Sequence, residues 1–135
     1  MAVTDLVAEF SDPLSAPFWQ AAARCELVFQ RCRNCGQNSL YPRPFCVSCH
    51  SDTLEWEAAS GLGIVFSKTK VWRQVLPTLP PPYVGAIVEL DEGPRLMTRL
   101  VNGEPSIGDR VRVAWLERGV QPRLPVFEPY SGSFA

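Results

Sequence analysis

Two Cys-x-x-Cys pairs, Cys32-Arg33-Asn34-Cys35 and Cys46-Val47-Ser48-Cys49, decide the fold of this chain. Ten residues separate the pairs, enough for a hairpin that brings them face to face. A tight backbone turn can direct both sulfurs of a pair to one side, and Gly36 turns easily out of the first pair. Four thiolates around one ion are a ligand set of structural zinc. The spacing therefore predicts a zinc ribbon with one structural ion, its ligands being Cys32, Cys35, Cys46 and Cys49.

Disulfides, redox chemistry and a single iron are the alternatives for these four cysteines. The first residues, Met1-Ala2-Val3-Thr4-Asp5, lack the basic start and apolar stretch of a signal peptide. We therefore expect a cytoplasmic protein, in which thiols stay reduced, and zinc is the preferred occupant.

Two further residues bear on the metal site. Cys25 precedes the first ligand by seven residues, and we expect a buried apolar thiol on a helix. His50 directly follows Cys49 and is the only histidine. It could replace a ligand or donate to a sulfur, but we expect a solvated loop residue.

Length and composition fit one domain with a small appendage. The chain has 135 residues, 46% of them hydrophobic, and a net charge of −1, which does not indicate a nucleic-acid or membrane partner. No apolar run approaches the roughly 20 residues of a membrane span. The 13 prolines indicate loops and stiff extended segments, whereas the order of the final residues, 131–135, stays open.

Three parts follow one another along the chain. Residues 1–26 form an N-terminal helical arm, with Asp12-Pro13 and Ala16-Pro17 as helix-start signals and a helix over residues 18–24. Residues 27–57 form the zinc ribbon. An extended segment at 26–31 leads into its first cysteine pair, and a strand of alternating pattern at 54–57 ends it.

The third part, residues 58–135, is an OB-fold barrel with a C-terminal tail. Five strands are predicted without an intervening helix, at residues 64–72, 83–90, 95–101, 107–115 and 124–127. In the fourth, Val111, Val113 and Trp115 face one way, and Arg110 and Arg112 face the other. Five short strands in about 70 residues suit a small OB-fold barrel. The fold class is therefore mainly β.

A ribbon followed by an OB-like barrel resembles the DUF35 family, OB-fold acyl-CoA-associated proteins with a rubredoxin-like zinc ribbon. The resemblance covers nearly the whole chain. It rests on Phe18-Trp19, the run from Leu27 to Gly36, Tyr41-Pro42-Arg43-Pro44-Phe45-Cys46, Cys49, Trp56, Gly61-Leu62-Gly63, Pro82-Tyr83-Val84, Glu89-Leu90-Asp91-Glu92-Gly93-Pro94-Arg95 and Leu124-Pro125-Val126-Phe127.

What the resemblance implies is a partner. Such proteins accompany thiolase-fold enzymes, including acetyl-CoA acetyltransferases, acyltransferases and steroid side-chain aldolases. The small subunit is thought to steady the thiolase-fold dimer and to help form a channel for CoA. We expect an accessory subunit in a hetero-oligomer of this kind, with an acyl-CoA thioester at the shared interface. Aldolase, thiolase and acyltransferase partners all remain open.

No catalytic set of the chain's own is visible. The sequence has no GxSxG elbow, HExxH helix or P-loop, and four thiolates leave zinc no open position for substrate. The acidic run Asp91-Glu92-Gly93-Pro94 is interpreted as a solvated hairpin turn.

Two basic groups are candidates for the phosphates of CoA. One lies on the ribbon and the other on the first barrel strand, and their members are Arg33, Arg43, Lys68, Lys70 and Arg73. Lys68, Lys70 and the neighbouring Trp72 alternate to one face of that strand, which can equally be an ordinary solvated face.

Two other functions compete with an accessory subunit. One is a single-stranded nucleic-acid-binding module, because ribbons and OB barrels both bind single strands. Residues 61–118 carry eight Lys/Arg against six Asp/Glu, and this near balance of charge does not favour a groove that binds a row of phosphates. A free-standing acyl-CoA-binding protein is the third hypothesis.

Overall fold

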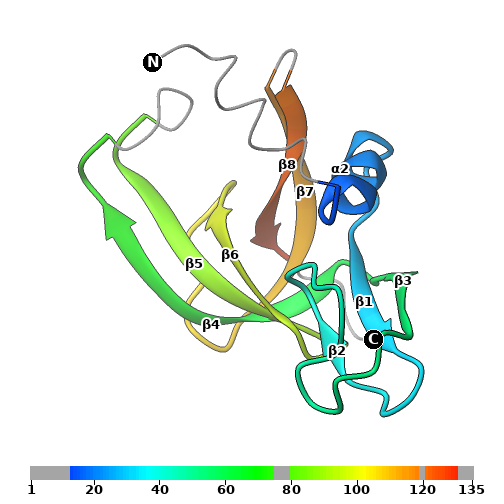
Figure 1. Ribbon diagram of the computed structural model, residues 1–135. Helices are drawn as coiled ribbons and strands as arrows, with labels where there is room; N and C mark the ends of the chain where they lie inside the picture. Colours follow the sequence, from blue (N-terminus) through cyan, green and yellow to red (C-terminus); the bar gives the residue numbers. More distant parts are fainter. Residues whose placement is uncertain (1–12, 75–79, 119–120, 131–135) are drawn as a thin grey trace.

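The computed structural model describes residues 13–74, 80–118 and 121–130 (Figure 1). It consists of one short helix, a small three-stranded sheet that carries the cysteines, and a closed five-stranded barrel. The predicted fold class is confirmed. Residues 1–12, part of the proline loop and the tail at 131–135 lie outside the described residues. Within those residues, no helix has the length and apolarity needed to cross a bilayer.

Helix α2 (Ala16–Ala23) has Ser15 at its N-cap position and Pro17 in its first turn. It ends in a paired motif in which Cys25 N–H donates to Ala22 O and Glu26 N–H donates to Ala21 O, each at 2.9 Å. This ending places Cys25 just past the helix, exposed and with a φ of 60°. The expectation of a buried helical thiol is therefore wrong, because the chain must turn left-handed there to enter the ribbon.

The ribbon sheet has the order β2-β1-β3 and is antiparallel throughout. Its strands are β1 (Val28–Cys32), β2 (Asn38–Ser39) and β3 (Leu54–Ala58). The sequence predicts β1 and β3, but β2 is too short to give an alternating pattern. Gln30 at the centre of β1 is only 5% exposed, and its side-chain amide exchanges two hydrogen bonds with the Arg43 backbone (2.9 and 3.3 Å). This contact fixes the loop that leads to the second cysteine pair.

The barrel closes in the order β4-β5-β6-β8-β7, and β7 pairs back to β4. Its strands are β4 (Leu62–Val71), β5 (Tyr83–Leu90), β6 (Arg95–Leu100), β7 (Arg110–Arg118) and β8 (Gln121–Pro129). All contacts are antiparallel except β6 with β8, which is parallel. Strand β8 is longer than predicted, because pairing with β7 outweighs the effect of Pro125 and Pro129.

One hydrophobic core joins the three parts. It contains Phe18 of α2, Phe29 and Leu40 of the ribbon, and the barrel residues Val65, Val88, Leu90, Leu96, Leu100, Val111 and Phe127. As predicted, Val111 is buried, Val113 and Trp115 pack against the core, and Arg110 and Arg112 are exposed.

The turn between β5 and β6 docks on the ribbon. Asn38 of β2 donates to the Glu92 carbonyl at 2.9 Å, and the Glu92 carboxylate accepts the Ser60 N–H at 2.8 Å. Pro94 is buried, and Glu92 is partly buried. The predicted hairpin turn is confirmed, and Asp91 and Gly93 are exposed as expected, but Glu92 and Pro94 are not fully solvated, because the turn contacts the ribbon and Ser60.

Candidate metal centre and ligand-binding surfaces

The two cysteine pairs form two turns with matching hydrogen bonds. In the first, Gly36 N–H donates to Cys32 O at 2.9 Å, and Cys32 N–H donates to Gln37 O at 2.9 Å. In the second, His50 N–H donates to Cys46 O at 2.9 Å, and Cys46 N–H donates to Ser51 O at 2.8 Å. Each turn thus points the two thiols of its pair in one direction.

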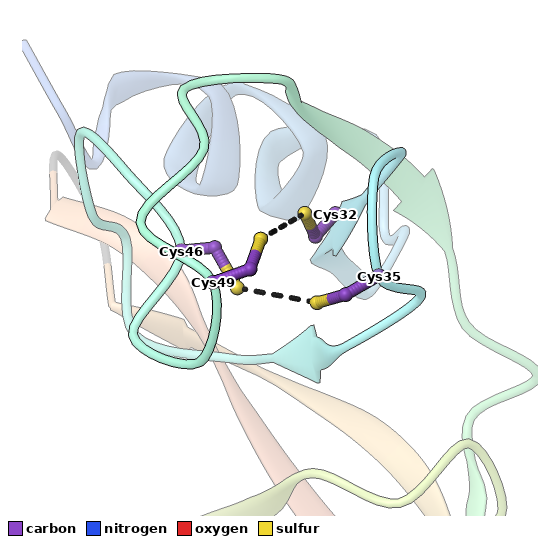
Figure 2. A group of neighbouring side chains, drawn as sticks. All are labelled: Cys32, Cys35, Cys46 and Cys49. Carbon is purple, nitrogen blue, oxygen red and sulfur yellow. Dashed lines mark hydrogen bonds between the residues drawn. The ribbon is translucent and has the colours of Figure 1, made fainter.

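All four sulfurs meet between the turns (Figure 2). Their Sγ atoms lie within 4.8 Å of one another, and the Cys32–Cys49 and Cys35–Cys46 pairs are each 3.6 Å apart. Sulfurs at about 2.3 Å from a tetrahedral zinc would be about 3.8 Å apart. Cys32 and Cys46 are buried, whereas Cys35 is exposed and Cys49 half-buried. The cluster is compatible with one structural zinc ion.

The thiols of the cluster differ in pKa. Backbone N–H groups of Cys35 and then Asn34 donate to Cys32 Sγ and lower the pKa of that thiol to about 6. The N–H groups of Cys49 and Ser48 likewise lower the pKa of Cys46. At Cys35, the donation from Gln37 N–H lowers the pKa, but desolvation and the neighbouring thiols outweigh it and raise it to about 12. The thiol of Cys35 thus stays protonated at neutral pH beside its neighbours, whereas a divalent cation between the four sulfurs would stabilise all four as thiolates.

Asn34 is a residue of the centre that the spacing argument left out. Its side-chain amide donates to Cys49 Sγ at 3.4 Å, from one turn across to the other. Donors of this kind orient ligands and tune their charge. His50 is exposed and lies outside the cysteine cluster, as expected of a loop residue.

The two ribbon arginines proposed for CoA have different surroundings. Arg33, just after β1, pairs with Glu55 of β3 at 2.6 Å, and this contact raises the pKa of Arg33. Arg43 has an exposed side chain beside a hollow of about 270 Å³ that Phe45, Val47 and His50 also line. Of the two, only Arg33 has a carboxylate partner among the described residues.

Lys68 and Lys70 of the second basic group lie in the C-terminal half of β4, whose end is distant from β1 and β2 in Figure 1. Lys68 Nζ donates to Pro105 O at 3.0 Å. Lys70 Nζ lies 3.9 Å from Glu104 and 5.0 Å from the Trp72 ring centroid. Glu104 and Pro105 belong to the loop between β6 and β7, so both lysines contact that loop. Arg73 is exposed just beyond the strand.

A cluster of four cysteines on a three-stranded sheet, joined to a closed barrel of OB topology, defines the class of zinc-ribbon/OB-fold proteins. Comparison with family models agrees for both halves. Residues 19–55 match the rubredoxin-like zinc ribbon domain of ChsH2, and residues 56–116 match the C-terminal OB-fold domain of ChsH2. The chain belongs to the DUF35 family.

Two solved structures are similar over most of the chain. The first, titled "Ltp2-ChsH2(DUF35) aldolase", has a TM-score of 0.80 and 38% identity, over 87% of this chain and 95% of the other. The second is a DUF35 protein of unknown function from Sulfolobus solfataricus, with a TM-score of 0.66 over 94% of this chain and 96% of the other. At 14% identity, the second supports the fold alone.

Two curated proteins are similar in sequence. One, from Thermomonospora curvata, is named "Probable enoyl-CoA hydratase alpha subunit" and is 40% identical over 83% of this chain. The other, from Methanocaldococcus jannaschii, is named "DUF35 domain-containing scaffold protein" and is 36% identical over 58% of this chain. The present chain spans only 36% and 57% of the lengths of these relatives.

Proposed function

We propose that this chain is a non-catalytic accessory subunit of a thiolase-fold acyl-CoA enzyme. It stabilises the complex and helps to form the passage for the CoA arm. The observation that carries the proposal is the match, at 38% identity and over 95% of its length, to a chain solved as an Ltp2-ChsH2(DUF35) aldolase. The name of the M. jannaschii relative, a scaffold protein, points the same way. The preferred partner is an aldolase, and steroid side-chain degradation is one process in which such a complex would act.

The chemistry of the described residues suits a subunit that binds but does not react. Their group of potential metal ligands is the four-cysteine cluster, in which zinc would have a full coordination shell. Such an ion cross-links two turns and offers no position for substrate. Reduced thiols at this centre also agree with a cytoplasmic location.

A docking surface for the partner is proposed on the ribbon. Tyr41, Phe45 and Val47 are 59%, 53% and 51% exposed, although each is a large hydrophobic residue. They follow one another along the loop that Gln30 fixes, with Arg43 among them. Apolar side chains held on a rigid loop around a cation suit a surface that meets both a protein and an anionic ligand. Arg43 is therefore the preferred candidate for a CoA phosphate.

The test is reconstitution with a thiolase-fold protein from the native host. Acyl-CoA cleavage or acyl transfer is measured for that protein alone and with the zinc-loaded chain added. The proposal predicts that the chain alone is inactive and raises the activity of the partner. No change in activity and no binding would contradict it.

Matched variants distinguish docking from CoA contact. Phe45→Asp is expected to abolish the complex, whereas Ile107→Asp, at a site 63% exposed on the barrel, is expected to leave it intact. Arg43→Gln is expected to raise the KM for acyl-CoA several-fold without disrupting the complex. Arg31→Gln, which changes an exposed arginine on β1, serves as its control.

Binding of single-stranded nucleic acid is less favoured by the barrel surface. Several barrel arginines are already paired with carboxylates: Arg95 with Glu89 at 3.3 Å, Arg110 with Asp91 at 2.8 Å, and Arg112 with Glu128 at 2.8 Å. A groove that tracks phosphates needs free cations in a row.

A further inference from the structure

A groove lies over β4, β5 and β6 and extends to Leu124 of β8. Alternation along β5 buries Val84, Ala86 and Val88 in the barrel and leaves Gly85 and Ile87 on the opposite face. The groove has a volume of about 410 Å³, and most of its lining is apolar, including Val71, Tyr83, Ile87, Met97 and Leu124. That volume lies in the range of small-molecule pockets, which also combine an apolar lining with a few polar groups.

Arg99 is a charged group of this groove whose Nε has no acceptor among the described residues. That Nε is buried, and the guanidinium lies 5.9 Å from the Tyr83 ring centroid. No carboxylate among the described residues pairs with it. Lys68, the other cation of the lining, already donates to Pro105 O at 3.0 Å. A buried donor without a partner costs stability, and the cost is removed when an anion binds.

Gly85 forms part of the floor of the groove, directly opposite Arg99 on β6 and Thr69 on β4. Nothing in the fold requires glycine there. A Cβ at Gly85 would meet Val71 Cγ2 at 3.8 Å and Thr69 Cγ2 at 4.0 Å, which are ordinary contacts. Glycine inside a strand weakens the strand and often marks a place where a ligand approaches the backbone closely. The bare backbone at residue 85 thus deepens the groove beside the unpaired guanidinium.

The groove continues toward the helix. Met97, Thr98 and Leu124 also line a second hollow of about 250 Å³, together with Phe18, Trp19 and Tyr41. Met97 lies on β6 two residues from Arg99 and is 72% exposed despite its apolar side chain. An elongated ligand with its charge at Arg99 can therefore extend its apolar part over Met97 toward Trp19.

We propose that the face formed by β4, β5 and β6 binds a small amphipathic anion, whose carboxylate or phosphate pairs with Arg99 and whose apolar body lies over Gly85 and Met97. Arg99 and Gly85 line the groove, and Arg43 does not. The second hollow reaches the docking surface on the ribbon only at Tyr41. The proposal does not depend on the accessory-subunit function. If the chain does not bind a thiolase-fold partner, the proposed anion site is unaffected. If the chain does not bind an amphipathic anion, the proposed accessory-subunit function is unaffected.

The test is a titration of the isotope-labelled, zinc-loaded 135-residue chain, followed by amide chemical shifts. The probes are decanoate, decyl phosphate and the neutral decanol, each below its aggregation limit. The proposal predicts saturable shifts at Thr69, Gly85 and Arg99 with the anionic probes and much weaker binding of decanol. Whichever anion binds more tightly identifies the head group. Absence of saturable binding by both anions, or equally tight binding of decanol, would overturn the proposal.

Three variants locate the site. Arg99→Met keeps the apolar stem and is expected to weaken binding of the anion about tenfold or more. Gly85→Leu fills the floor and is expected to block binding of all probes. Arg95→Met removes an arginine from the same strand, one that pairs with Glu89, and is expected to bind like the unmodified chain. Equal weakening by Arg95→Met and Arg99→Met would show general charge attraction and contradict the site.

Thermal stability separates a binding role from a structural one. Because Arg99 Nε is unpartnered and Gly85 lies in a strand, Arg99→Met and Gly85→Ala are expected to melt at or above the temperature of the unmodified chain. A marked fall in melting temperature for Arg99→Met, with binding retained, would assign this arginine to the fold instead.

Discussion

His50 occupies in the second cysteine turn the place that Gly36 occupies in the first. Each N–H donates at 2.9 Å to the carbonyl of the first cysteine of its pair, and each residue has positive φ, 80° for Gly36 and 64° for His50. Glycine adopts this conformation without strain, whereas a residue with a Cβ does not. The second turn therefore carries a strain that the first one lacks.

Replacing His50 by glycine should relieve that strain. We expect His50→Gly to stabilise the zinc-loaded chain by roughly 0.5–1 kcal/mol, measured by urea unfolding. His50→Ala keeps the Cβ and is the matched control, with no gain expected. Loss of stability in His50→Gly would indicate that the imidazole contributes to the centre.

Removal of one thiol should disrupt the ribbon. Cys46→Ser leaves three thiolates, and because metal binding is coupled to folding we expect loss of zinc and a destabilisation of roughly 3 kcal/mol or more. Cys25→Ser is the control, because Cys25 is exposed and lies outside the cluster. Zinc content by elemental analysis and the melting temperature are the readouts. An unchanged zinc content in Cys46→Ser would refute the four-thiolate assignment.

Two glycines of the barrel should respond in opposite ways to alanine. At Gly63, where β4 pairs with both β5 and β7, a Cβ would collide with the Glu89 carbonyl oxygen, a backbone atom that cannot move aside cheaply. We expect Gly63→Ala to destabilise the barrel by about 1–3 kcal/mol in denaturant unfolding. Gly85→Ala, with ordinary contacts only, should not be destabilising. If the two substitutions changed the free energy of unfolding equally, steric contact with the Glu89 carbonyl would not be the cause of the effect at Gly63.

Glu128 makes stability depend on pH. Hydrogen bonds from Asn102 Nδ2 at 2.7 Å and Arg112 Nε at 2.8 Å lower its pKa in the folded chain. The ionised carboxylate therefore stabilises the fold above its unfolded pKa of about 4.3, and this contribution disappears as pH falls through the lower folded pKa.

We expect Glu128→Gln to cost roughly 0.5–1 kcal/mol at pH 7 and progressively less as the pH falls below about 4. Urea unfolding of the variant and of the unmodified chain across this pH range measures the difference in their free energies of unfolding. Release of zinc at low pH affects both chains and cancels in that difference. Glu104→Gln, which removes an exposed carboxylate elsewhere in the chain, controls for the change in net charge. A difference for Glu128→Gln that does not vary with pH would contradict the linkage.

Much of the fold follows from local patterns. The Cys-x-x-Cys spacing predicts the metal cluster, and turn signals such as Asp91-Glu92-Gly93-Pro94 separate strands whose bounds nearly match the structure. The exposed position of Cys25 is not predicted, because the left-handed turn there carries no glycine to mark it. The contacts of Glu92 with Ser60 and Asn38 are not predictable from local patterns, because they join residues far apart in the chain.

The candidate binding surfaces depend more on tertiary structure. In the sequence Arg99 is one of several strand arginines, and only the structure shows that its Nε is buried without a partner among the described residues while Arg95 has Glu89. The sequence does contain a signal at Gly85, because a glycine inside a mostly apolar strand often marks close approach of a ligand or of another backbone segment. Conversely, Lys68 and Lys70 alternate on one face as predicted, but their contacts with Pro105 and Glu104 appear only in the fold.

The most direct test of the central claim is gel filtration with light scattering of the zinc-loaded chain mixed with the thiolase-fold protein of its native host. The account predicts one species of defined stoichiometry at micromolar concentration, which Phe45→Asp abolishes and Ile107→Asp preserves. Independent elution of the two proteins at that concentration would contradict the assignment as an accessory subunit.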